Sequence, residues 1–221
     1  MRHTTLILLV AAALTAPALG AQETARERAQ RTLTPPVFAD LSALAASVQP
    51  EGIPEEPLFA KALEGAAKRV PQDRLVPAVR DYAGRLGQAR AALGIDAEVP
   101  LLVAGADALQ RGVPANALRG LPTDRPRSPM ALLVLAELVE SGVPADRALA
   151  IVREVMAQRA RDERMLDASA RVRMLIRQGM SPADAVERVR AMLRDRSGTV
   201  GPLVPPGSQP ITRERRRLRD R

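Results

Sequence analysis

Apolar residues recur along this chain with the three- and four-residue spacing of an α-helix. The clearest case follows Pro71, where six apolar positions alternate at intervals of four and three residues: Leu75, Val79, Tyr82, Leu86, Ala89 and Leu93. Pro77 is the one discordant residue, and it predicts either a kink or a helix that begins near Val76. The pattern therefore predicts one long amphipathic helix in this part of the chain.

The same spacing predicts further amphipathic helices. Their apolar positions run over 37–48, 54–67, 148–156, 165–176 and 185–193. Two other segments, 99–109 and 130–139, are apolar nearly all round, which is typical of a helix buried by its neighbours. A short turn or helix is expected at 114–118.

A boundary motif separates many of these segments: Gly or Arg, an aliphatic residue, Pro, and then a carboxylate or amide. It occurs at 52–56, 69–73, 112–116, 142–146 and, with one inserted residue, 179–184. Gly tolerates the left-handed conformation that ends a helix, and Pro suits the first helical position. The acidic or amide residue then faces the unpaired N–H groups of the first turn. Each motif thus predicts the end of one helix and the start of the next.

Two serines strengthen the predicted helix starts. Ser128 and Pro129 read as the N-cap and the first residue of a helix that follows a loop with two prolines. Ser181 with Asp184 three residues later forms a variant of the capping box.

Successive boundary motifs are 17, 43, 30 and 37 residues apart. Regular arrays such as tetratricopeptide repeats keep a fixed period near 34 residues and place aromatic residues at set positions. This chain does neither. The predicted fold is all-α, either an irregular multi-helix bundle or a short stack of helical hairpins, with about seven to nine helices and a disordered C-terminal tail.

The N-terminus has the pattern of a secretory signal peptide cleaved after Gly20. Arg2 precedes an apolar stretch at 6–14, and the segment ends in small residues. An uncleaved membrane anchor is the alternative, but Thr15 and Pro17 break the apolar run. No later stretch has the length and apolarity of a membrane span, so we expect an exported protein that is periplasmic or secreted.

Four segments are predicted: a signal peptide at 1–20, a flexible segment at 21–34, a single helical domain at 35–196, and a Pro/Gly linker with an Arg-rich tail at 197–221. The net charge is +8 for the chain, and the last segment carries six Arg against two acidic residues. The basic character is therefore concentrated at the C-terminus.

The available side chains exclude most catalytic chemistry. The chain has no Cys, and its one histidine, His3, lies in the predicted signal peptide. This removes His-based acid–base catalysis, nucleophilic triads, and zinc or copper sites built from imidazole or thiolate. No phosphate loop, dinucleotide fingerprint or calcium loop is present. We expect no cofactor, no metal site and no enzymatic activity.

Carboxylates in apolar helices are the remaining enzymatic candidates: Asp107, Glu137 and Glu140. A carboxylate in an apolar setting could act as an acid or a base. However, Asp107 lies four residues before Arg111, the spacing of a helical ion pair, and the two glutamates stand near a helix end where water can reach them. A carboxylate-based enzyme is therefore the third hypothesis.

Two other features favour structural interpretations. A charged cluster, Arg159, Arg161, Asp162, Glu163 and Arg164, could dock an acidic partner, but its mixed signs favour a solvated helix start. The methionines at 130, 156, 165, 174, 180 and 192 could line an adaptable groove, but their helical spacing favours core packing.

The composition leaves two main hypotheses for function. The first is a non-catalytic protein-interaction module of the bacterial envelope, whose partner is another envelope protein. The second is electrostatic tethering, in which the tail binds anionic lipid or lipopolysaccharide. The residues that would bind are Arg213, Arg215, Arg216, Arg217, Arg219 and Arg221. Nucleic acid is disfavoured as a target because export separates the protein from the chromosome.

Overall fold

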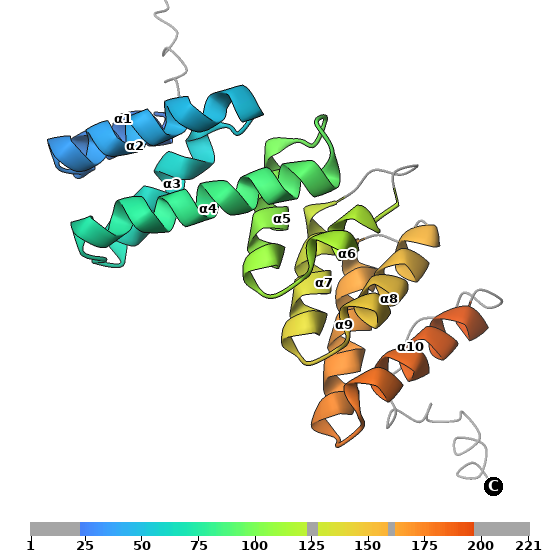
Figure 1. Ribbon diagram of the computed structural model, residues 1–221. Coiled ribbons are helices and arrows are strands. Elements are labelled where there is room, and N and C mark those ends of the chain that lie inside the picture. The colour runs from blue at the N-terminus through green and yellow to red at the C-terminus, as the bar shows by residue number, and fades with distance from the viewer. Residues whose placement is uncertain (1–22, 123–127, 159–161, 197–221) are drawn as a thin grey trace, which may run out of the picture. The chain divides into compact units, whose positions relative to one another are not determined.

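The computed structural model describes residues 23–122, 128–158 and 162–196, and these are helices joined by short turns, without β-strands (Figure 1). The described ranges contain ten α-helices and one 3-10 helix. They are α1 (Ala25–Thr32), α2 (Pro35–Val48), η1 (Gln49–Glu51), α3 (Glu55–Ala67), α4 (Gln72–Leu93), α5 (Val99–Gln110), α6 (Ala115–Arg119), α7 (Pro129–Glu140), α8 (Ala145–Ala157), α9 (Asp162–Arg177) and α10 (Pro182–Arg196). The predicted all-α fold is confirmed.

Nine of these helices lie where the apolar pattern predicted them, and α1 is the addition. It occupies most of the segment that was predicted to be flexible, so that prediction is wrong for residues 25–32. Thr24 and Glu27 form a capping box in which each side chain accepts a hydrogen bond from the other residue's backbone N–H. Ala25 and Ala29 are fully buried. Two alanines give too small an apolar stripe to recognise in the sequence.

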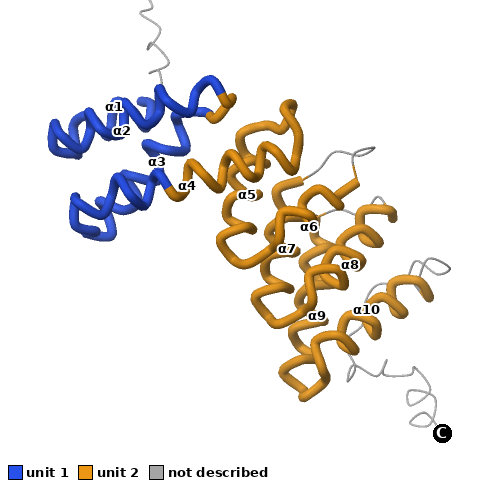
Figure 2. The backbone as a smooth tube through the Cα atoms, in the orientation of Figure 1, with its two compact units in different colours: residues 1–50, 54–80 blue, residues 51–53, 81–221 orange. Residues whose placement is uncertain are grey.

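The described chain divides into two compact units, although one domain was expected over 35–196. The first unit spans residues 1–50 and 54–80, and the second spans residues 51–53 and 81–221 (Figure 2). The boundary at residues 80 and 81 falls within α4, which continues past Pro77 as one helix. The signal peptide predicted at 1–20 and the tail predicted at 197–221 lie outside the described residues.

In the first unit, α3 packs against α1 and α2. Phe38 of α2 and Phe59 of α3 have ring centroids 5.8 Å apart, and the guanidinium of Arg26 lies over both rings. Arg26 also pairs with Glu55 at 2.7 Å, while Glu56 accepts the backbone N–H of Ala25 at 2.8 Å. Side chains from the start of α3 therefore fix α1 in place.

In the second unit, three helical hairpins stack. Helices α5, α7 and α9 pack side by side in one row, and α6, α8 and α10 follow one another in a second row (Figure 1). Helix α7 contacts α5, α8 and α9, and six of its twelve residues are buried. The prediction that its apolar segment forms a buried centre is confirmed.

The three hairpin turns share one backbone geometry. Gly112, Gly142 and Gly179 have φ values of 89°, 84° and 94°. In each case the N–H of the next residue bonds to a carbonyl five residues back, at 3.0, 3.0 and 3.1 Å. This is the Schellman ending expected from the boundary motif. The repeated turn makes each hairpin close in the same way.

The prolines of the motif differ from the prediction. Pro54, Pro114 and Pro144 are N-cap residues, the first two with extended backbones, and only Pro182 is the first residue of its helix. In the last motif Ser181 supplies the extra residue and takes the N-cap position, which moves the proline one place into the helix. Proline fits both positions because its φ near −65° is compatible with an extended and with a helical residue.

Candidate functional site

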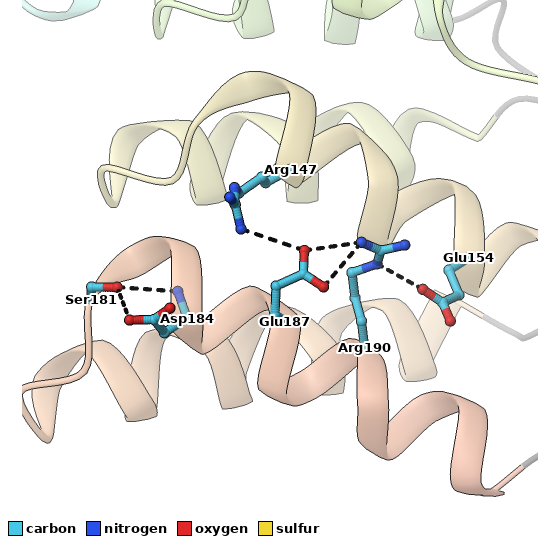
Figure 3. A network of polar contacts seen from close by, with 6 residues as sticks. All are labelled: Arg147, Glu154, Ser181, Asp184, Glu187 and Arg190. Atoms are coloured by element: carbon cyan, nitrogen blue, oxygen red, sulfur yellow. Dashed lines mark hydrogen bonds and ion pairs between the residues drawn. The ribbon is translucent and has the colours of Figure 1, made fainter.

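A network of polar contacts in the second unit joins α8 to α10 (Figure 3). Arg190 of α10 donates from Nε to Glu154 of α8 at 2.8 Å, and its Nη1 donates to Glu187 at 3.0 and 3.3 Å. Arg147 of α8 lies 3.6 Å from Glu187, and Arg194 lies 3.5 Å from Glu154. We call these five residues the α8–α10 network.

Burial distinguishes the members of the α8–α10 network. The side chain of Glu154 is 16% exposed and that of Arg190 is 25% exposed, whereas Arg147 and Glu187 are each more than 40% exposed. The hydrogen bond to Glu154, aided by the charge of Glu187, raises the pKa of Arg190. A guanidinium held between two carboxylates carries no proton-transfer chemistry, so this network stabilises the packing of α10 on α8.

The last hairpin also contains the predicted cap. The hydroxyl of Ser181 accepts the N–H of Asp184 at 3.2 Å and donates to the carboxylate of Asp184 at 2.6 Å (Figure 3). The cap is confirmed, but the carboxylate is bonded to the hydroxyl instead of the backbone N–H. Ser128 likewise caps α7 by accepting from the N–H of Ala131 at 3.3 Å, as predicted.

Glu137 makes a contact that the sequence pattern missed. Its Oε2 accepts a hydrogen bond from the hydroxyl of Ser169 at 3.0 Å and lies 3.7 Å from the guanidinium of Arg173. Ser169 is fully buried on α9, and it is the one buried polar side chain among the described residues. Glu137 therefore makes a packing contact between α7 and α9, while its side chain stays 25% exposed to water.

The other two candidate carboxylates share a different arginine. Arg111 pairs with Asp107 at 3.4 Å, which confirms the predicted ion pair, and lies 3.8 Å from Glu140. The side chains of Asp107 and Glu140 are 52% and 65% exposed. The structure thus brings Asp107 and Glu140 to one arginine at the surface, and places Glu137 elsewhere on α7.

The methionines differ in burial and do not share one environment. Met156 and Met165 are buried, as core packing requires, while Met130, Met180 and Met192 are half-buried. Met174 is 37% exposed on α9. The predicted core role holds for the buried pair only.

Several predicted residues fall outside the described ranges. These include Arg159 and Arg161 of the charged cluster, whereas Asp162, Glu163 and Arg164 are exposed in the first turn of α9. The candidate anion-binding residues of the tail also lie outside: Arg213, Arg215, Arg216, Arg217, Arg219 and Arg221.

Among the described residues, no group of three or more His, Cys, Asp or Glu side chains is placed to hold a metal ion. In the same part of the chain, no helix combines the length and the apolar character that crossing a bilayer requires.

Comparison with known proteins returned no relative. No protein-family model, no curated protein and no solved structure matches this chain.

Proposed function

We propose that this protein is a non-catalytic interaction module of the bacterial envelope. The observation that carries the proposal is the stack of three hairpins, in which α5, α7 and α9 form one row and α6, α8 and α10 the other. Stacked helical hairpins offer extended surfaces whose helices are held rigid by their neighbours, and proteins of this architecture commonly bind other proteins.

The distribution of polar groups supports this proposal. The charged contacts within the hairpin stack pair arginines with carboxylates across neighbouring helices, as Arg190 does with Glu154 and Arg111 does with Glu140. Each of these two carboxylates is thus paired with an arginine of a neighbouring helix or turn. The pattern favours a rigid scaffold over a reaction centre, in which acid and base groups would face a common cavity.

Export is the second element of the proposal, and it rests on the sequence of residues 1–20. A signal peptide would deliver the helical body to the periplasm or the medium, where its partner would be another envelope protein. A fusion of residues 1–24 to a reporter that is active only after export tests this element directly. Reporter activity that persists after residues 6–14 are replaced with polar residues would contradict export by a signal peptide.

Crosslinking in intact cells, followed by mass spectrometry of copurifying proteins, tests the interaction role. The full chain is compared with a chain that ends at Arg196. We expect a defined partner to copurify with both forms and to slow hydrogen exchange over a continuous helical surface. Recovery of the same background proteins as an unrelated exported control would overturn the proposal.

An alternative function is electrostatic tethering through the tail. The specific observation is the sequence of residues 213–221, in which six Arg stand against Glu214 and Asp220. Arginine suits phosphate groups because its planar fork donates two hydrogen bonds at once. Tethering predicts that the chain binds vesicles containing anionic lipid, that the chain ending at Arg196 does not, and that about 0.5 M salt releases the full chain. Vesicle binding that persists in the chain ending at Arg196 and in about 0.5 M salt would exclude tethering.

A further inference from the structure

Arg26 of helix α1 covers the only two phenylalanines in the sequence. Phe59 of α3 is fully buried, and its ring lies next to that of Phe38 of α2. The guanidinium of Arg26 lies 5.8 Å from the ring centroid of Phe38 and 5.2 Å from that of Phe59. The aromatic contact of the first unit therefore lies beneath a side chain of α1.

The buried side of α1 is small. It consists of Ala25 and Ala29 within the helix and Leu33 at its C-cap, one side chain every four residues. The other side chains of the helix are partly or fully exposed. Two methyl groups and one leucine bury little apolar surface, and an isolated helix of eight residues is at best marginal in water. The packing of α1 therefore recovers little more free energy than the ordering of its residues costs.

The polar contacts between α1 and α3 are mostly open to water. Arg26 pairs with Glu55 at 2.7 Å, and the two side chains are 43% and 50% exposed. Exposed ion pairs of this kind contribute little to stability. The backbone N–H of Ala25 donates to Glu56 at 2.8 Å in a partly buried contact. Both glutamates belong to the first turn of α3, so this polar attachment is confined to the N-terminal end of α1.

Helices α2 and α3 also have supports that do not involve α1. Helix α2 begins at Pro35, whose fixed φ suits a first helical residue whatever precedes it. Helix α3 packs against α2, and at its other end Gly65 lies against Leu75 of α4. The connection from α1 to α2 is Leu33 and Thr34, both with extended backbones. A change of dihedral angles at these two residues is enough to move α1 alone.

We propose that α1 is a releasable cover, which leaves α3 by rotation about Leu33 and Thr34 while α2 and α3 stay folded. Release exposes the rings of Phe38 and Phe59. The released segment loses its helix, because eight residues do not hold one without packing. Such local opening of the least stable element does not require the rest of the fold to unfold. This inference does not depend on the proposed function, because it concerns the first unit alone.

Hydrogen exchange of the full chain gives the first test. The amides of α1 should exchange at least about a hundred times faster than the slowest amides of α3, because they open without global unfolding. Equal exchange rates in α1 and α3 would overturn the proposal, since both helices would then open only together.

A buried charge that holds α1 open gives the second test. Ala29→Asp places a carboxylate where the alanine is fully buried, and the cost of burying an unpaired charge prevents docking. Gln30→Asp is the matched control, because it adds the same residue at the next position of α1, where the side chain is exposed. In Ala29→Asp the amides of α1 should exchange as in an unfolded peptide, while those of α2 and α3 keep their rates within about tenfold. In Gln30→Asp all three helices should remain protected.

The two phenylalanine rings report the surface that α1 leaves behind. A soluble nitroxide should broaden the NMR signals of Phe38 and Phe59 at least about three times more in Ala29→Asp than in Gln30→Asp. Three results of these variants would each overturn the proposal. They are the loss of protection of α2 and α3 together with α1 in Ala29→Asp, continued protection of α1 in that variant, and equal broadening of the rings in the two variants.

Discussion

Arg69 and Gly112 occupy the same left-handed position at the ends of α3 and α5. Their φ values are 58° and 89°. The next residue, Val70 or Val113, donates its N–H to the carbonyl five residues back at 3.0 Å in both turns. Arg69 is the one described residue other than Gly with a positive φ. The backbone of the boundary motif is thus conserved between the two turns although the side chain is not.

Arg69→Gly should stabilise the protein. The left-handed conformation costs a residue with a Cβ about 1–2 kcal/mol, and the greater freedom of Gly in the unfolded chain offsets about half of that. We expect a gain of about 0.5–1 kcal/mol in the free energy of unfolding, measured by urea denaturation with far-UV circular dichroism. Arg69→Ala keeps the strain and should change little. Gly112→Ala should lose about 1 kcal/mol because of the left-handed backbone alone, since the added Cβ would meet no atom within 4 Å.

A second comparison separates helix propensity from packing. Gly84 of α4 is exposed, and a Cβ there would meet nothing within 4 Å. Gly105 of α5 is buried, and its Cβ would lie 2.8 Å from Leu93 Cδ1 and 3.0 Å from Ala89 Cβ. Gly84→Ala should therefore gain about 0.5–1 kcal/mol from helix propensity. Gly105→Ala should lose about 1 kcal/mol net, because the crowding of α4 outweighs the same gain.

The two glycines belong to the same compact unit, so one denaturation curve serves both. Equal stabilisation by both substitutions would show that α5 can move away from α4 at no cost.

The buried hydroxyl of Ser169 depends on Glu137. Glu137→Ala should cost about 1–3 kcal/mol, because it leaves a fully buried donor without its acceptor. Ser169→Ala should cost about 1 kcal/mol, since water can still reach Glu137, whose side chain is 25% exposed. A double-mutant cycle by urea denaturation should give a loss smaller than the sum by about 1 kcal/mol. Strict additivity would mean that the hydroxyl finds another acceptor.

Local pattern was enough to predict the helices and many of their ends. The seam from Leu75 to Leu93 is buried at every predicted position, and the pair of Asp107 with Arg111 forms as its spacing indicated. These features depend on residues three to five apart, for which helix geometry alone fixes the contact. The cap at Ser181 follows for the same reason.

Contacts between hairpins could not be predicted in this way. Glu154 and Arg190 are 36 residues apart, and Glu137 and Ser169 are 32 apart. Their meeting depends on how α7, α8, α9 and α10 stack, and the unequal spacing of the boundary motifs gave no register for that stack. Ser169 also occupies an apolar position of α9, where one small polar residue leaves the helical pattern unchanged.

Glu64 should lose its contribution to stability in acid. Hydrogen bonds from Lys61 and Lys68 lower its pKa from 4.5 to about 2. A carboxylate whose pKa is lowered by folding stabilises the protein above pH 4.5, and this stabilisation disappears as the pH falls to about 2. Because the side chain is 43% exposed, solvent screening limits the effect to less than about 1 kcal/mol.

Carbon-detected NMR titration of Glu64 measures that pKa directly. Glu64→Gln should be slightly less stable than the parent protein at pH 7 and equally stable below about pH 2. About 1 M salt should reduce the difference at pH 7. A pKa of Glu64 close to 4.5 would contradict the pairing with the two lysines.

Removing Arg190 should loosen α10 more than removing any other charge of the α8–α10 network. Arg190→Met keeps an apolar stem but withdraws the 2.8 Å donor from Glu154, a carboxylate that is only 16% exposed and is otherwise approached by Arg194 at 3.5 Å. We expect a loss of about 1–3 kcal/mol. Arg147→Met is the matched control and should lose less than about 0.5 kcal/mol, because Arg147 and Glu187 are both exposed and 3.6 Å apart. Hydrogen exchange should locate the effect in the amides of α10. If both variants exchange alike there, partial burial of Glu154 does not strengthen its bond to Arg190.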